Sequence, residues 1–434
     1  MFNTEILKER RLILDGGTGT VLAAAGLKAG ERPELWNLTH PEEVARLHRA
    51  YFDAGSDIVC TNTFGANALN HDSEALKKII EAAVEIADTE RRAAEKKYGG
   101  KKYIAFDMGS LGKLLKPFGD LDFEDAVKIF SESIKIGAAA GVDIVYFETF
   151  TDVYELKAAI VAAKESCDLP IFATCAYEKN GRLMMGADVA TVVAMCEGLG
   201  VSAIGTNCGM GPDLMKNVVR ELNKYASVPI IVKPNAGLPK TVDGRAVYDL
   251  SVESFAEDMK EIAEIGAGLV GGCCGTTPEY ISATSTALSY VKYVPNEKNK
   301  VRLVSSYSKA VEFDGQTEIK MLSDGADAEE YEEAVRSRDI DYMIEQAMEQ
   351  VDEGAEILGI NVALDGTDET SLLIETVTAL QSIVKIPFMI ETDNIEALEA
   401  AMRIYNGKPL ISFGNRKGLE AVRRLAGKYG GEIK

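Results

Sequence analysis

The chain has 434 residues, 46% of them apolar, which is enough for ordinary buried cores and indicates more than one domain. Its formal net charge of −21 argues against nucleic acid or an anionic membrane surface as a partner, and no apolar run approaches the length of a membrane span. The N-terminus has no apolar signal core, so we expect a cytoplasmic protein whose seven cysteines are reduced.

Eight short apolar runs recur between residues 11 and 288, and a segment with helical periodicity follows each of them. The runs do not alternate between apolar and polar residues, which is typical of strands buried on both faces. In chain order they are RLILDGG, SDIVCTNTFG, YIAFDMGSLG, VDIVYFETFTD, PIFATCAY, VSAIGTNCGMGP, VPIIVKPNAGLP and AGLVGGCCGTTP. Eight such units predict an α/β fold with a TIM (βα)8 barrel over residues 1–290.

Each run ends in small, polar or sulfur-containing residues, on the side where barrel enzymes place their chemistry. We therefore expect all eight strand-end loops to build one site. The three histidines, His40, His48 and His71, lie outside these strand ends and are expected to be surface or capping residues.

Two adjacent cysteines, Cys273 and Cys274, follow the eighth run among glycines that permit a turn. A disulfide between neighbouring cysteines would be strained, so a metal explains the pair better. Two thiolates make an incomplete zinc site, and Cys208, at the end of the sixth run, is the natural third ligand.

Three thiolates leave one tetrahedral position open, as in catalytic zinc sites. Such a zinc is poor at activating water but can bind a thiol as thiolate, so we expect a thiol substrate. The alternative is a purely structural site, in which zinc is fully coordinated without substrate. The remaining cysteines are expected to be small buried apolar residues: Cys60, Cys167, Cys175 and Cys196.

The motifs DGGTGT, TNTFGAN, FETFTD, GTNCGMGP, KPNAGLP and GGCCGTTP resemble the homocysteine S-methyltransferase family. Their order resembles the N-terminal homocysteine-binding barrel of cobalamin-dependent methionine synthases, over residues 12–288. The resemblance implies that Cys208, Cys273 and Cys274 bind Zn²⁺ and that zinc binds the sulfur of homocysteine. A methyl group is then delivered to that sulfur, with no catalytic residue beyond the zinc-bound substrate thiolate.

Homocysteine also carries an ammonium and a carboxylate group that must be held. Glu148 follows an apolar run, where an ordinary surface acid is not expected, so we assign it to the ammonium. The glycine-rich turn after the first run offers backbone N–H groups to the carboxylate. Asn62 and Asn235 are expected to orient the substrate, and Asn235 to occupy the open zinc position when substrate is absent. The predicted substrate-binding residues are Asp15, Gly17, Thr18, Gly19, Asn62, Glu148 and Asn235.

Two aspartates have an alternative role, because Asp15 and Asp107 could each cap a helix or fix a loop instead. The barrel also departs from the family at one turn. Gly109, Ser110, Leu111 and Gly112 stand where the family has glycine, proline, threonine and glycine. The turn glycines are kept, so we expect the fold to be unchanged.

A charged linker containing a proline is expected over residues 291–305, and about four further βα units over 306–434. The first of these includes one long helix within residues 328–355. This partial barrel resembles the first half of the pterin-binding domain of methionine synthases. Gly359, Glu391 and Ser412 stand where that family has two aspartates and an asparagine, although Asn361 persists, which argues against folate binding.

Four βα units leave two unpaired sheet edges and an open core. We expect this half-barrel to pair with its own copy in a second chain or to dock on another protein. The alternative is that the sequence is a fragment of a longer protein.

The favoured function is methionine formation by transfer of a methyl group from a methylcorrinoid to zinc-bound homocysteine. The sequence contains no recognisable cobalamin-binding segment, so methylcobalamin is expected to arrive on a separate protein or domain. One alternative is a cobalamin-independent methyltransferase that uses S-methylmethionine, S-adenosylmethionine or a betaine. Another is a homocysteine-presenting module that is active only with a partner corrinoid protein.

Overall fold

The computed structural model describes residues 2–242, 245–296, 301–415 and 418–434. Two compact units divide the chain, one of Met1–Met184 with Val201–Asn299 and the other of Met185–Gly200 with Lys300–Lys434. Residues 297–300 of the predicted linker lie outside the described residues, and the linker bounds stay a prediction.

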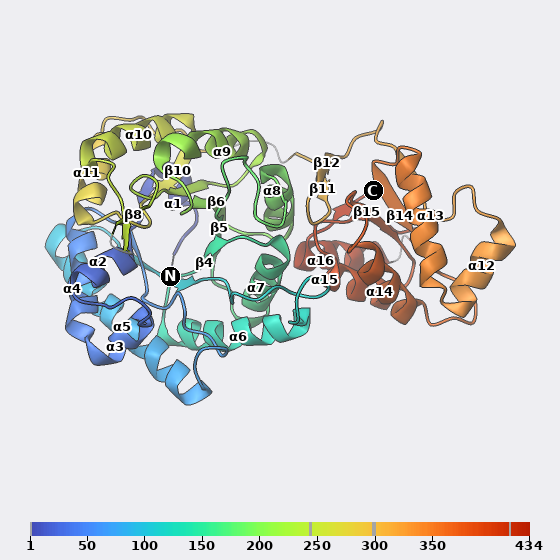
Figure 1. Cartoon of the computed structure of the whole chain (residues 1–434), viewed down its shortest axis with the longest axis horizontal. Helices are drawn as coiled ribbons and strands as arrows, with labels where there is room; N and C mark the ends of the chain where they lie inside the picture. The colour runs from blue at the N-terminus through green and yellow to red at the C-terminus, as the bar shows by residue number, and fades with distance from the viewer. Residues whose placement is uncertain (1, 243–244, 297–300, 416–417) are drawn as a thin grey trace. The chain divides into compact units, whose positions relative to one another are not determined.

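The first unit is built on eight parallel strands with helices packed outside them (Figure 1). The strands are β1 (Leu12–Ile13), β2 (Ile58–Cys60), β3 (Tyr103–Met108), β4 (Ile144–Phe150), β5 (Ile171–Cys175), β6 (Ala203–Asn207), β7 (Ile230–Lys233) and β10 (Ala267–Val270). The main helices of this unit that follow them in turn are α4 (Pro41–Asp53), α5 (Ser73–Tyr98), α6 (Phe123–Ala140), α7 (Val153–Ser166), α9 (Pro212–Tyr225), α10 (Val252–Ile265) and α11 (Pro278–Leu288). The helix that follows β5 along the chain, α8 (Val189–Gly198), belongs to the second unit. The predicted (βα)8 barrel is confirmed, with strand order β1-β10-β7-β6-β5-β4-β3-β2.

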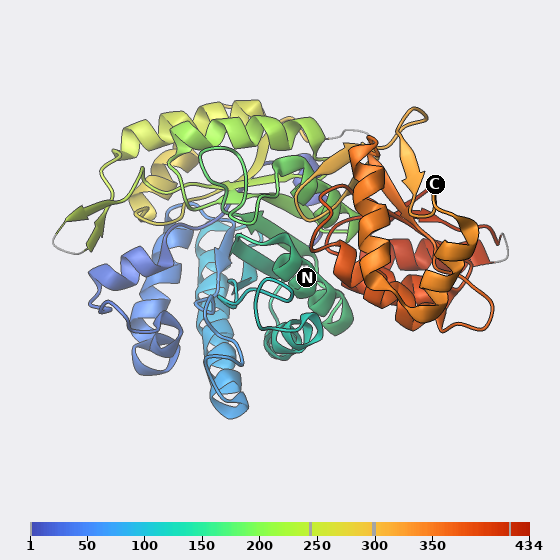
Figure 2. The same ribbon diagram turned by 45° about the vertical axis from the view of Figure 1, so that its right-hand side comes forward.

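Three short helices surround β1: α1 (Ile6–Glu9) before it, and α2 (Thr18–Ala24) and α3 (Trp36–Thr39) after it. A hairpin follows β7, in which β8 (Lys240–Val242) pairs antiparallel with β9 (Arg245–Val247). Figure 2 shows this hairpin, in olive, projecting from the barrel. None of the described helices combines the length and apolar character needed to cross a membrane.

The barrel interior is a packed core, because strands such as β3, β5 and β6 are buried along their whole length. Its N-terminal end is closed by Phe2, whose ring packs edge-on against Tyr103 at 4.7 Å and Phe172 at 5.7 Å. Close packing of the strands also requires glycine at position 205 of β6, since a Cβ on Gly205 would lie 1.8 Å from the carbonyl oxygen of Ile231.

The barrel closes where β1 meets β2, and two aspartates bridge this junction. The Asp57 amide donates to the Ile13 carbonyl at 2.7 Å, and the Asp57 carboxylate accepts from the Ile13 amide at 3.0 Å. Two residues further along, Asp15 Oδ2 accepts from the Cys60 amide at 2.6 Å. Arg10 donates to both oxygens of the Asp57 carboxylate, at 2.9 and 3.1 Å, and Lys102 Nζ lies 3.5 Å from it. Together they supply the positive charge that a buried acid needs.

The second unit contains a five-stranded parallel sheet in the order β13-β14-β15-β16-β17. Its strands are β13 (Ile319–Met321), β14 (Ile357–Ile360), β15 (Phe388–Glu391), β16 (Leu410–Ser412) and β17 (Glu432–Ile433). The helices are α12 (Ala328–Ser337), α13 (Ile340–Asp352), α14 (Glu369–Leu380), α15 (Ile395–Ile404) and α16 (Leu419–Tyr429), and a hairpin of β11 (Leu303–Ser305) and β12 (Ala310–Glu312) precedes the sheet. The four predicted βα units are present, followed by a short fifth strand that was not predicted.

One predicted helix is wrong, because residues 328–355 form two helices rather than one. The break lies at Arg338, whose φ of 60° is left-handed. Asp339 then begins the second helix by accepting a hydrogen bond from the Tyr342 amide at 3.0 Å. A good N-cap therefore outweighed the continuous helical periodicity of the sequence.

The Asp57→Ala substitution tests the junction between β1 and β2. It removes the acceptor of the Ile13 amide and leaves the buried Lys102 without its acid, so we expect a loss of about 3–5 kcal/mol in the free energy of unfolding. Urea unfolding followed by the fluorescence of Trp36, the single tryptophan of the chain, measures this loss in the barrel.

The matched control is Asp53→Ala, which removes a more exposed acid paired with Lys97 on the surface. We expect its effect to stay within about 1 kcal/mol. Equal losses for the two substitutions would contradict a special role for Asp57.

Candidate metal centre

The C-terminal ends of the barrel strands enclose a cavity of about 590 Å³. Seven of the eight strands or the loops after them contribute to its wall, and β5 is the exception among the described residues. At the end of β5, Thr174 lies behind the wall, where its hydroxyl donates to Asn207 Oδ1 at 2.7 Å. The expectation that all eight loops line the site is therefore wrong for this strand.

Three cysteine thiols meet in the cavity wall. The Sγ atoms of Cys208, Cys273 and Cys274 all lie within 4.8 Å of one another. Cys208 follows β6 and the pair follows β10, and these two strands flank β7 in the sheet. Backbone carbonyls at the end of β7 hold both loops, since Lys233 O accepts from the Cys208 amide at 3.1 Å and Pro234 O accepts from the Cys273 amide at 2.8 Å.

The turn that carries the cysteine pair needs glycines. A Cβ on Gly272 would lie 2.4 Å from Thr276 Oγ1, and a Cβ on Gly275 would lie 2.3 Å from the Tyr248 side chain. Gly275 also has a φ of +82°, a conformation that residues with side chains rarely adopt. The glycines around the pair are therefore required by space as well as by backbone conformation.

The thiols share their protons unequally. Hydrogen bonds from Cys208 and Cys273, with a further one from Tyr248, lower the pKa of Cys274 to about 3. The hydrogen bonds with Cys208 and Cys274, together with burial, raise the pKa of Cys273 well above its ordinary value. A bound divalent cation would favour ionisation of all three thiols.

Two residues of the wall have left-handed backbone conformations, Thr149 with φ 66° and Cys208 with φ 58°. For a β-branched residue such as threonine this is a strained conformation. The buried Asn207 supports it, because its Oδ1 accepts from the Thr149 amide at 2.9 Å and its Nδ2 donates to Thr149 Oγ1 at 2.6 Å. Asn207 lies in the sixth predicted run, directly before Cys208, but no role was predicted for it.

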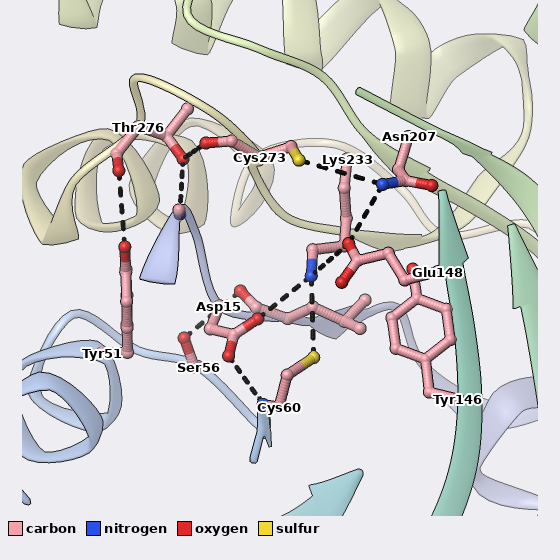
Figure 3. A network of polar contacts seen from close by, with 12 residues as sticks. Asp15, Tyr51, Ser56, Cys60, Tyr146, Glu148, Asn207, Lys233, Cys273 and Thr276 are labelled. Carbon is pink, nitrogen blue, oxygen red and sulfur yellow. Dashed lines mark hydrogen bonds and ion pairs between the residues drawn. The ribbon is translucent and has the colours of Figure 1, made fainter. Parts of the chain in front are cut away.

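Lys233, at the end of β7, is a site residue that the sequence analysis missed. It is 2% exposed. Its ammonium lies between two carboxylates, 2.9 Å from Glu148 Oε1 and 3.2 Å from Asp15 Oδ1 (Figure 3). The signal was present, because Lys233 ends an apolar run just as Glu148 does.

Asp107 and Glu148 form an acidic pair in the cavity wall. Burial raises the pKa of Glu148, against the opposing effect of Lys233. Burial and the nearby charge of Glu148 raise the pKa of Asp107. Asp107 Oδ1 is buried and has no hydrogen-bond partner among the described residues. An unpartnered buried acceptor is rare and indicates a place for a donor from a ligand.

Five of the seven predicted substrate-binding residues line the cavity: Gly17, Thr18, Gly19, Asn62 and Glu148. The other two, Asp15 and Asn235, are buried and are not among the lining residues. Asp15 bonds to the β2 backbone and to Lys233. Asn235 Oδ1 is buried without a partner among the described residues.

Two of the lining residues already have protein partners. The Gly17 amide donates to Thr276 Oγ1 at 3.0 Å, and Asn62 Nδ2 donates to the Pro33 carbonyl at 2.7 Å. Contacts between these residues and a substrate stay predictions.

Glu155 of α7 supports the rim of the cavity from outside. Its carboxylate accepts from Ser110 Oγ at 2.7 Å and from the Leu111 amide at 2.6 Å, in the loop after β3. The amide of Gly109, at the start of that loop, donates to the carbonyl of Phe64, which lines the cavity. The serine in the turn that departs from the family pattern thus has a structural partner.

The Glu155→Gln substitution tests this buried acid. Burial raises the pKa of Glu155 to about 7, opposed by the hydrogen bond from Ser110. Between pH 4.5 and 7 the folded chain keeps a proton that the unfolded chain has lost, so the stability from this group is present below pH 4.5 and is lost as the pH rises through 7. The loss amounts to about 3 kcal/mol, and the glutamine variant should not show it.

Urea unfolding followed by Trp36 fluorescence at pH 5 and pH 8 measures this difference. Glu42→Gln, at an exposed position of α4, is the control and should match the wild type at both pH values. If Glu155→Gln also shows the wild-type dependence, the carboxyl group of Glu155 is not its source.

Comparison with known proteins agrees with this fold. The sequence profile described as "Homocysteine S-methyltransferase" matches residues 12–288. The methionine synthase of Mycobacterium tuberculosis is 29% identical over 429 residues and that of Mycobacterium leprae is 31% identical over 434 residues. Each alignment covers 95% of this chain, but this chain spans only 36% of the length of those proteins.

Among solved structures, the barrel is similar to the homocysteine methyltransferase MmuM from Escherichia coli. Its apo form has a TM-score of 0.55 at 23% identity, covering 66% of this chain and 98% of that one. Its metallated form has a TM-score of 0.56 at 24% identity, covering 65% and 99%. This likeness establishes the fold of the barrel. The match of the sequence profile to well over half of the chain shows more: the chain belongs to the homocysteine S-methyltransferase family.

Proposed function

We propose that the chain binds one Zn²⁺ through Cys208, Cys273 and Cys274 and uses it to methylate the sulfur of homocysteine, forming methionine. The observation that carries this proposal is the meeting of three thiols in the wall of a cavity that also holds buried acids. A thiol substrate with an ammonium group would suit this wall, because its sulfur could bind the metal held by the cysteines and its ammonium could contact the buried acids.

The spacing of the thiols fits zinc. Tetrahedral ligands at the ordinary Zn–S distance lie about 3.8 Å apart. Cys208 Sγ and Cys274 Sγ are 3.9 Å apart, and the third sulfur lies within 4.8 Å of both. Three thiolates would leave one position for the substrate sulfur. Zinc would lower the pKa of a thiol bound at that position and so supply a thiolate at neutral pH.

The protein residues would orient the substrate. Glu148 and the unpartnered oxygen of Asp107, which both belong to the cavity wall, would accept hydrogen bonds from its ammonium. Asn235, with a buried and unpartnered Oδ1, is the proposed occupant of the open position before substrate binds. The substrate sulfur then forms the new bond to the methyl carbon, and the donor leaves with the electron pair of the bond that breaks.

We propose a methylcorrinoid, carried on a separate protein or domain, as the methyl donor. Two methionine synthases match 95% of this chain, so their resemblance includes the C-terminal unit. The structure of MmuM, in contrast, matches about two thirds of this chain. S-methylmethionine, S-adenosylmethionine or a betaine is the alternative donor.

The C-terminal sheet offers little support for folate as a ligand. At the carboxyl ends of its strands, Asn361 Nδ2 donates to Glu391 Oε1 at 3.1 Å and Ser412 Oγ donates to Glu391 Oε2 at 2.8 Å. These side chains satisfy one another, which favours a structural role for them. We propose that this unit serves in contacts with another chain or domain.

Zinc binding is tested with Cys273→Ser. We expect one zinc per wild-type chain and an affinity at least about 100-fold lower in the variant, because a direct ligand matters at least as much as its supporting residues. Competition with a chromophoric chelator measures the affinity. Cys167→Ser, at a partly exposed cysteine outside the cluster, should bind zinc like the wild type.

X-ray absorption at the zinc edge, with and without homocysteine, then tests the open position. Replacement of one nitrogen or oxygen ligand by sulfur is expected. An unchanged set of ligands would mean a structural zinc and would remove the basis for the proposed reaction.

The donor is tested by incubating the zinc-loaded chain with homocysteine and free methylcobalamin. We expect methionine to form, and none in Cys273→Ser. Formation from S-methylmethionine alone would overturn the donor assignment. Formation only after a corrinoid protein is added would identify a homocysteine-presenting module.

A further inference from the structure

A buried lysine lies beneath the proposed ammonium site. Lys233 Nζ contacts Glu148 Oε1 at 2.9 Å, Asp15 Oδ1 at 3.2 Å and Cys60 Sγ at 3.6 Å. It also lies over the Tyr146 ring, 5.4 Å from the centroid. A buried ammonium is tolerated only when such partners surround it, so the position of this lysine is tightly defined.

The contacts of Lys233 connect Glu148 to a rigid part of the barrel. Asp15 cannot shift freely, because its second oxygen accepts from the Cys60 amide at 2.6 Å across the junction of β1 and β2. Asp15 therefore fixes the lysine ammonium, and the ammonium fixes Glu148. Asn207 Nδ2 adds a contact to Glu148 Oε1 at 3.2 Å. Figure 3 shows these side chains converging from separate strands.

The charge of Lys233 also affects the ionisation of the buried acids around it. Three acids, Asp15, Asp107 and Glu148, are at most 7% exposed, and neighbouring carboxylates do not all ionise in a buried site without positive charge. One lysine offsets the charge of one acid, so ionisation of a second acid calls for another positive charge. A ligand ammonium would supply that charge.

We propose that Lys233 is a positioning residue that makes this pocket selective for thiols bearing an ammonium group, by holding Glu148 in place as a carboxylate. This inference rests on the proposed function. A lysine that merely repelled the ligand ammonium would predict the reverse effect. The support that Lys233 gives to Glu148 should outweigh its repulsion of the ligand ammonium, because a neutral acid makes hydrogen bonds only about half as strong as a carboxylate does.

The test compares two thiols in direct binding to the zinc-loaded chain by calorimetry. Homocysteine is compared with 4-mercaptobutanoate, which keeps the thiol and the carboxylate but lacks the amino group. In Lys233→Met we expect the preference for homocysteine to fall about tenfold, with little change for 4-mercaptobutanoate. In a Glu148→Gln background the same substitution should have no further effect on the preference.

Lys102→Met is the matched control. Lys102 is also a buried lysine beside an aspartate, with Nζ 2.7 Å from the Ser56 carbonyl, but it is not among the residues that line the cavity. Its loss should reduce stability without changing the preference between the two thiols. Zinc content and thermal unfolding are measured for every variant. If Lys233→Met does not fold, Lys233→Gln replaces it.

The outcomes separate the two proposals. If the wild type binds homocysteine and the lysine variant keeps or increases its preference, this inference is wrong and the proposed function stands. If the zinc-loaded wild type binds neither thiol, the proposed function fails and the inference fails with it.

Discussion

The rest of the barrel depends on how β1 is joined to β2. A ring of eight strands must close, and here the last junction relies on carboxylates as much as on backbone pairing. Asp57 and Asp15 each accept a hydrogen bond from an amide of the opposite strand. Because a buried carboxylate needs positive charge nearby, this junction brings lysines into the fold. Arg10 and Lys102 neutralise Asp57, and Lys233 neutralises Asp15.

This requirement connects closure of the barrel to chemistry at its mouth. The lysine that neutralises Asp15 comes from β7, the strand that lies between the two cysteine-bearing strands. The carbonyl of Lys233 holds the loop of Cys208, while its side chain reaches Glu148. One strand end therefore positions a thiol, an acid and the closing junction together. A change at this position is expected to affect ligand selectivity as well as folding.

The sequence predicted the parts of this arrangement that depend on strand order. Continuous apolar runs predicted the eight strands, and their ends predicted that Cys208 would meet Cys273 and Cys274. Contacts between side chains from separate strands were not predictable. Lys233 was overlooked because a lysine is ordinarily an exposed residue, and its burial depends on two acids far away in the sequence.

The same limit explains the other differences. His48 was expected at the surface or at a cap, but it is fully buried within α4. Burial lowers its pKa to about 4, so it is neutral near pH 7. The break between α12 and α13 was missed because Arg338 has no intrinsic preference for a left-handed backbone. Periodicity reports which face of a helix is buried, and neither a single buried histidine nor a single turn changes that pattern enough to be recognised.

The strained backbone in the cavity wall shows how the site is held ready for a ligand. Left-handed conformations at Thr149 and Cys208 cost about 1–3 kcal/mol each. The buried Asn207 makes hydrogen bonds to Thr149, Glu148 and Thr174, and each contributes about 1 kcal/mol. The two amounts are similar, so the protein itself can maintain this geometry. A ligand that binds to such a wall does not have to order it, and more of its interaction energy is available for affinity.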